Sequence, residues 1–137
     1  MTPEAAVDSM FAEITQCTPA NVEIIWTDVP SNKPLSNRWI RPTVKHVAGE
    51  QSSLSGALGS KQHKMTGLLI VQCFVPSGSG GLEAVQLATV YVNHFAAIRN
   101  SAIWYRNQHF VEVGNDGPSL QYNVVIEFEY DITIVRI

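Results

Sequence analysis

Residues 120–134 read LQYNVVIEFEYDITI, which is the most regular pattern in the 137-residue chain. Apolar side chains occupy every even position from Leu120 to Ile134, and polar or charged side chains occupy most of the odd ones. This alternation predicts a β-strand with one buried face, while the other face is wet or forms an interface. At about 3.3 Å per residue the strand would span roughly 50 Å, which is long for so small a domain. We therefore expect it to bend near Asp131 or to end in a projecting arm.

Other extended segments lie upstream of this strand. Residues 64–75 are apolar on both faces in their middle, which favours a central strand that is covered on both sides and ends at Pro76. Residues 39–48 also read as extended, and Pro42 within them predicts an edge strand or a bulge. Further short strands are expected at residues 22–26, 101–106 and 109–113, with a loop at 28–37 and a turn at 115–118.

Two segments have helical rather than strand spacing. Apolar residues recur every three or four positions in residues 3–17 and again in residues 82–97. Thr2 is placed to cap the first helix, and Ser79 or Gly80 the second. Together these elements predict a single α+β domain over residues 1–137. It has a mostly antiparallel β-sheet with an N-terminal helix and a second helix packed on it, plus a long hairpin loop.

The long loop and the polar face of the last strand supply the candidate interface residues. Residues 49–61 are rich in glycine and serine, and loops of this length are usually functional or disordered. Apolar side chains are not needed in a purely solvated linker, so we expect those of this loop to contact a partner. The loop would then be mobile in the free protein and become ordered on docking. Paired acids on a polar strand face are ordinarily solvated, with an interface role as the alternative. The candidates are Leu54, Ala57 and Leu58 in the loop and Glu127 and Glu129 on the strand.

Residue types found in catalytic and metal sites occur here without the arrangements that such sites need. No two histidines share a metal-ligand spacing, although a hairpin could bring His46 and His63 together. The loop serines lack the context of an activated nucleophile. The Gly-Ser-Gly-Gly turn at 78–81 is followed by Leu82 and Glu83 rather than by the lysine and hydroxyl of a phosphate loop. We expect no catalytic residue, no cofactor and no metal. The four histidines are His46, His63, His94 and His109.

The amino-acid composition further narrows the classes of protein to which the chain could belong. The net charge is −3 and the nine Lys and Arg residues are scattered, which argues against a general nucleic-acid binder. Only 15% of residues are charged, so part of the neutral surface is expected to lie against partners. Cys17 and Cys73 are expected to be reduced and mostly buried. We see neither a secretory signal nor an apolar run long enough to span a membrane, which predicts a cytoplasmic protein.

Four segments, taken in order, carry a family resemblance. They are WTDVP at 26–30, WIRPTV at 39–44, GLLIVQCFVPSGSG at 67–80 and YNVVIEFEY at 122–130. This layout resembles the tail terminator, or tail completion, proteins of long-tailed bacteriophages and prophages. The resemblance covers nearly the whole chain. It rests on the order of elements and on the segment in which a strand, a proline, a glycine-rich turn and a helix follow one another, and no single motif is diagnostic.

The resemblance implies a structural role rather than catalysis. Such a protein forms a hexameric ring that caps the tail tube, ends its polymerisation and offers a surface for head–tail joining. The implied partners are further copies of the chain, the tail tube protein and the head–tail connector protein, with DNA only passing non-specifically through the lumen and no membrane. The implied location is the virion tail, and the host cytoplasm during assembly.

Two other readings of the sequence stay open. The first is a head–tail connector or completion protein of similar size, which the order of elements does not exclude. The second is a small ligand-binding or enzymatic α+β domain with a histidine site. An enzyme predicts a pocket and no open ring, so the oligomeric state separates these classes.

Overall fold

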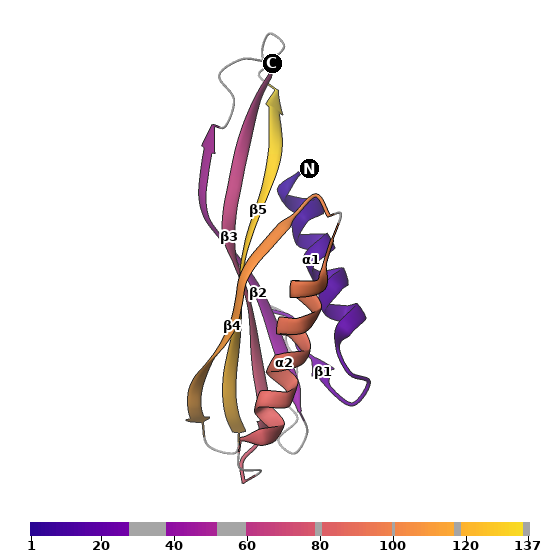
Figure 1. Ribbon diagram of the computed structural model, residues 1–137, viewed down its shortest axis with the longest axis vertical. Coiled ribbons are helices and arrows are strands. Elements are labelled where there is room, and N and C mark those ends of the chain that lie inside the picture. The colour runs from indigo at the N-terminus through magenta and orange to yellow at the C-terminus, as the bar shows by residue number, and fades with distance from the viewer. Residues whose placement is uncertain (28–37, 52–59, 79–80, 100, 117–118, 136–137) are drawn as a thin grey trace.

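The computed structural model describes residues 1–27, 38–51, 60–78, 81–99, 101–116 and 119–135 (Figure 1). Its strands form one five-stranded sheet in the order β1-β2-β3-β5-β4. β1 is parallel to β2, and every other neighbouring pair is antiparallel, which confirms the predicted α+β fold with a mostly antiparallel sheet. The elements are α1 (Pro3–Cys17), β1 (Glu23–Ile24), β2 (Trp39–Gln51), β3 (Ser60–Pro76), α2 (Leu82–Ala97), β4 (Trp104–Asp116) and β5 (Ser119–Val135).

The last strand, β5, stays paired along its whole length. β5 pairs with β3 without a register shift from Ser119 to Val135, and Asp131 lies opposite Lys64 within that run. Of the two expectations for β5, a bend near Asp131 or a projecting end, Figure 1 shows the second: β3 is also 17 residues long and pairs with all of β5 as both strands extend past α1. The ends of β2, β3 and β5 together reach beyond the start of α1, which gives the molecule its elongated shape (Figure 1).

Both helices lie where their spacing predicts. The Thr2 hydroxyl accepts a hydrogen bond from the Ala5 amide at 3.1 Å, and α1 ends at Cys17, directly before the extended Thr18. α2 covers the predicted residues, but its N-cap is Gly81, with φ 86° and no side-chain cap. The prediction of a cap at Ser79 or Gly80 was therefore wrong: the chain enters α2 through a left-handed residue, a conformation that glycine adopts without strain.

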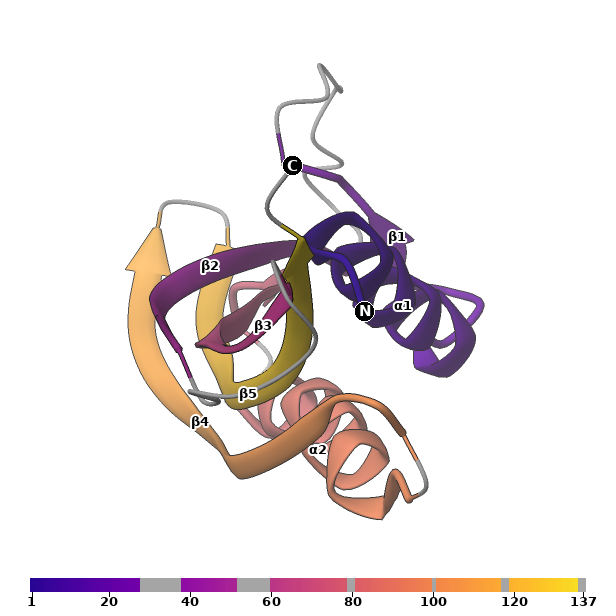
Figure 2. The same ribbon diagram turned by 90° about the horizontal axis from the view of Figure 1, so that it is seen from above.

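The main core lies on one face of the sheet, and a smaller buried cluster of Ile25, Trp39 and Phe74 lies on the opposite face beside β1. In the main core, alternate residues of β3 and β5 are fully buried, and they form a single cluster with buried side chains of both helices. Figure 2 shows α1 and α2 on the same side of the strands. We call this the covered face. Its largest buried side chains are Tyr91, Tyr130, Phe95, Phe128 and Met10.

The edges of the sheet depart from the predicted boundaries. Residues 101–106 and 109–113 are not two strands but belong mainly to one, β4, with a bulge between Arg106 and His109 where Asn107 has φ 53°. β2 runs on to Gln51 and β3 starts at Ser60, so both ends of the predicted loop 49–61 are strand. Among the described residues, β1 pairs with β2 only at Trp39 and Ile40, so Pro42 lies where β2 is an edge strand, which was one of the two predictions for it. The bulge of β2 lies between His46 and Ala48 and not at Pro42. The predicted loop 28–37 lies outside the described residues.

Candidate functional site

The second face of the sheet is covered by neither α1 nor α2, and we call it the open face. On β5 it consists of the odd positions from Gln121 to Asp131, all of them partly exposed. The register of the strands assigns the neighbouring side chains to the same face. These are Arg41, Thr43 and Lys45 on β2, Lys64, Thr66, Leu68, Ile70 and Gln72 on β3, and Trp104, Arg106, His109 and Val111 on β4. The same register also assigns Trp39 and Phe74 to this face, where their stacked rings are buried with Ile25 beside β1.

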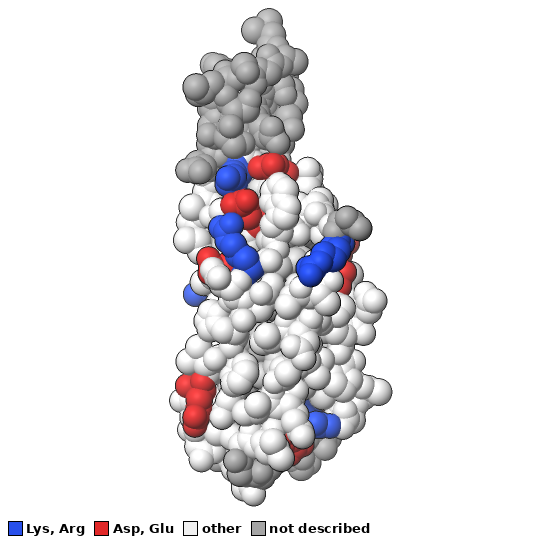
Figure 3. Space-filling model, in the orientation of Figure 1, with Lys and Arg blue, Asp and Glu red and all other residues white. Residues whose placement is uncertain are grey.

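One end of the open face is charged and paired within the chain. Glu129 lies 3.8 Å from the Lys64 Nζ and 3.6 Å from the Arg106 Nη2, and its side chain is only 16% exposed. The Asn107 amide donates a hydrogen bond to Glu127. Figure 3 shows charges of both signs gathered in the upper half of the view, with few below. The two acids predicted as interface candidates are thus held by neighbouring strands, and an interface role for them stays a prediction.

The middle of the open face is apolar. Leu68, Ile70 and Val125 are partly buried there and do not join the core cluster under the helices. A small hollow of about 230 Å³ opens beside Leu68, with Val47 of β2 and Arg106 of β4 in its lining. Apolar side chains on a solvated sheet face are the usual sign of a surface that another element covers.

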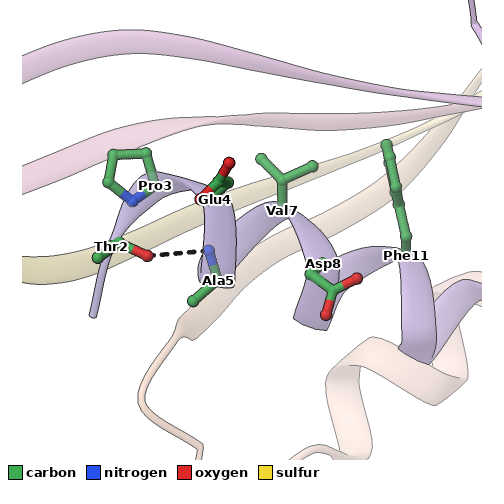
Figure 4. Close-up of a pocket in the computed structure, with 7 residues that line it drawn as sticks. All are labelled: Thr2, Pro3, Glu4, Ala5, Val7, Asp8 and Phe11. Atoms are coloured by element: carbon green, nitrogen blue, oxygen red, sulfur yellow. Dashed lines mark hydrogen bonds between the residues drawn. The ribbon is translucent and has the colours of Figure 1, made fainter.

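A second surface runs along α1. Pro3, Val7 and Phe11 recur every four residues and project to one side of the helix (Figure 4). With Glu4 and Asp8 they line an open groove of about 690 Å³. The Phe11 ring also contacts Trp26, with the two ring centroids 4.8 Å apart. The sequence pattern placed Val7 and Phe11 in the same apolar stripe as Met10 and Ile14, but the structure buries only Ala6, Met10 and Ile14. The spacing of Pro3, Val7 and Phe11 was the signal for a separate stripe.

The histidines do not gather into a site. The His46 Nε2 lies 2.5 Å from the Tyr130 hydroxyl, and the His94 Nε2 lies 2.6 Å from Glu13 Oε2, where it links the two helices. The hairpin leaves His46 opposite Gly67, four residues from His63 along β3, so it does not bring these two histidines together. Within the described ranges no group of three His, Cys, Asp or Glu residues could hold a metal ion. No helix among those residues is long and apolar enough to cross a membrane.

Both cysteines are free thiols, as predicted, with Cys73 buried and Cys17 half-buried. Burial raises the pKa of the Cys17 thiol to about 11 and also raises the pKa of Cys73. Leu54, Ala57 and Leu58 lie outside the described residues, and their interface role stays a prediction.

Gly67 is a structural position that the sequence pattern did not single out. A Cβ there would lie 2.1 Å from the Lys45 carbonyl oxygen and 2.6 Å from the Phe128 ring. Only a residue without a side chain lets β2 and Phe128 approach β3 this closely. A lone glycine within a strand pattern is the signal that could have identified it.

The observed architecture is a two-layer α+β fold in which one sheet face is covered by helices and the other is left open. The chain belongs to the phage tail terminator protein family, whose family model matches residues 4–123. It is accordingly a structural component of a bacteriophage tail. A protein of known structure aligns over 100% of this chain and 97% of its own, with a TM-score of 0.59 and 14% identity, which shows a shared fold. No curated protein matches the sequence.

Proposed function

We propose that the protein forms a ring of about six copies that caps the tail tube, ends its polymerisation and provides the surface for head–tail joining. Family membership supports the tail role, and the observation that carries ring formation is the uncovered sheet face with its apolar centre at Leu68, Ile70 and Val125. A sheet face of this kind is ordinarily buried against another element. The partners are further copies of the chain, the tail tube protein and the head–tail connector protein, which meet in the host cytoplasm during assembly.

The oligomeric state and the length of tail tubes test this proposal together. Light scattering and negative-stain microscopy should detect rings in the purified protein or on the ends of tail tubes. Tubes polymerised with the protein should stop at a defined length, whereas tubes without it should overgrow. A chain that stays monomeric at every concentration, with and without tubes, contradicts the proposal. A ring that joins heads to finished tails but leaves tube length unchanged supports the alternative, a head–tail connector protein.

DNA passes through the proposed ring without a binding site of its own. The chain carries a net charge of −3, and the basic residues Lys64 and Arg106 are paired with Glu129. Because DNA must slide through the lumen, we expect the purified protein to bind DNA weakly at physiological salt. Tight, salt-sensitive binding in a filter or anisotropy assay would argue against a passive lumen.

The hairpin tip is proposed to dock on the tail tube or on a neighbouring copy. Replacing residues 52–59 by a short turn leaves the described strands β2 and β3 intact, so the protein should still fold. Tail capping should then fail, because Leu54, Ala57 and Leu58 are removed with the tip. A shortened protein that still yields tails of normal length shows that the tip is only a connector.

A further inference from the structure

The first helix presents an acidic surface beside an apolar groove. Residues 3–17 contain three carboxylates and neither lysine nor arginine. Glu13 is held by His94, while Glu4 and Asp8 are exposed and line the groove together with Val7 and Phe11. The helix therefore offers apolar side chains with negative charge at their side (Figure 4).

The open face has a part with the complementary character. β2 carries Arg41 and Lys45 in its first half, whereas its one acid, Glu50, lies near the far end, opposite Lys64 in the register. The register places Lys45 next to Leu68 and Arg41 next to Gln72, so this half of the open face combines positive charge with apolar β3 side chains. Lys45 is exposed, and Arg41 lies over the Trp39 ring at 5.4 Å from its centroid.

Neighbouring acids do not cancel this complementarity. Glu129 is paired with Lys64 and Arg106, and Glu127 accepts a hydrogen bond from Asn107. Glu129 is therefore compensated by cations of both β3 and β4, and Glu127, opposite Leu68, is held toward β4. Arg41 and Lys45 form no ion pair with a described residue, so their positive charge is available to a partner.

The two surfaces cannot meet within one chain. Ala6, Met10 and Ile14 fix α1 against the core on the covered face, whereas Arg41 and Lys45 lie on the opposite face of the sheet. Contact between them requires a second copy. A contact between two different surfaces is head-to-tail, and such contacts close into a ring when the rotation between copies allows it.

We propose that α1 of one copy packs on the β2–β3 half of the open face of the next copy. Val7 and Phe11 then lie against Leu68 and Ile70, and Glu4 and Asp8 lie beside Arg41 and Lys45. Apolar burial holds the helix on the sheet, and the charge pairs fix its orientation and suppress wrong registers. This inference rests on the proposed ring and names the surfaces that build it.

Charge exchange tests the electrostatic half of the contact. Arg41→Glu/Lys45→Glu should weaken ring assembly roughly tenfold or more, and so should Glu4→Lys/Asp8→Lys, because each sets like charges against each other. Combining all four substitutions in one chain should restore rings. Arg99→Glu, on an exposed residue just after α2, is the matched control and should assemble as the wild type does. Thermal unfolding of each variant confirms that it is folded.

Cross-linking tests the apolar half without changing a charge. A chain with Val7→Cys and Ile70→Cys should form a ladder of disulfide-linked copies under oxidising conditions. A chain with Leu82→Cys and Ile70→Cys should not, because Leu82 is exposed on α2 rather than on α1.

The outcomes separate this inference from the ring itself. Rings that persist in both charge variants and yield no ladder overturn the α1 contact and leave the ring standing. Charge variants that form rings but no longer cap tubes assign α1 to the tail tube protein and also overturn it. A wild-type chain that never oligomerises overturns both proposals.

Discussion

The covered and open faces of the sheet belong to the same strands and yet differ in kind. On the covered face of β5, every even position from Tyr122 to Tyr130 is apolar and buried. On the open face, the odd positions combine Val125 with amides and paired acids, and all are partly exposed. Both faces share one backbone and one register, so the difference lies in what each contacts. The covered face holds the fold together, and the open face is the surface on which we propose that another copy packs.

The largest effect should come from breaking the covered face. Phe128 is fully buried and packs against His46 and Tyr130. Phe128→Ala should lower the free energy of unfolding by about 3–5 kcal/mol, because it removes buried area and leaves a cavity. Urea denaturation measures the loss. Val125→Ala on the open face is the matched comparison, and an equal loss there would show that the two faces do not differ in their contribution to stability.

A smaller loss is expected where the covered face is tightest. Gly67→Ala places a Cβ within 2.6 Å of the Phe128 ring and within 2.1 Å of the backbone of β2. Because a backbone atom cannot move aside cheaply, we expect a loss of about 1–3 kcal/mol in the same urea experiment. Gly49→Ala is the control, since its Cβ would meet only the flexible end of Met65. Equal stability of the Gly67 variant and the wild type would contradict the close packing.

Neutralising an acid on the open face should change stability little. Glu129→Gln weakens the pairs with Lys64 and Arg106, both of which are partly exposed. A partly exposed ion pair contributes at most about 1 kcal/mol to the free energy of unfolding, so we expect Glu129→Gln to lower that free energy by about 1 kcal/mol or less. The loss should become smaller as salt is added, because salt screens the charges. Thermal unfolding at low and high salt gives both numbers. A loss as large as that of the Phe128 variant would place Glu129 among the residues that hold the fold together.

The smallest expected effect on stability at neutral pH comes from the ionisation of the two cysteine thiols. Because burial raises the pKa of Cys17 from 9.0 to about 11, its contribution to stability is complete below pH 9 and is lost between pH 9 and 11. Both thiols should be alkylated more slowly at pH 8 in the native protein than in urea, and Cys73 more slowly than Cys17. Mass spectrometry of the alkylated protein follows each site. Native Cys73 reacting as fast as the unfolded chain would mean that the covered face opens readily.

Much of this fold could be read from local spacing. The alternation in residues 120–134 identified β5, and the doubly apolar run in 64–75 identified β3. Helical spacing identified both helices, and Thr2 marked the start of α1. These features depend on neighbours a few residues apart, so they are encoded in the sequence itself. The order of the elements was also sufficient to identify the tail terminator family.

Other features were decided only by partners remote in the sequence. β5 stays unbroken at Asp131 because β3 matches its length, and β4 is one strand because β5 continues past the bulge at Asn107. The candidate site also depends on residues remote in the sequence. Local spacing identified Glu127 and Glu129 as a polar pair, but the side chains that hold them come from the adjacent strands β3 and β4. Local spacing fixes which face a side chain takes, whereas tertiary packing decides what covers that face, because burial depends on the contacts made across the fold.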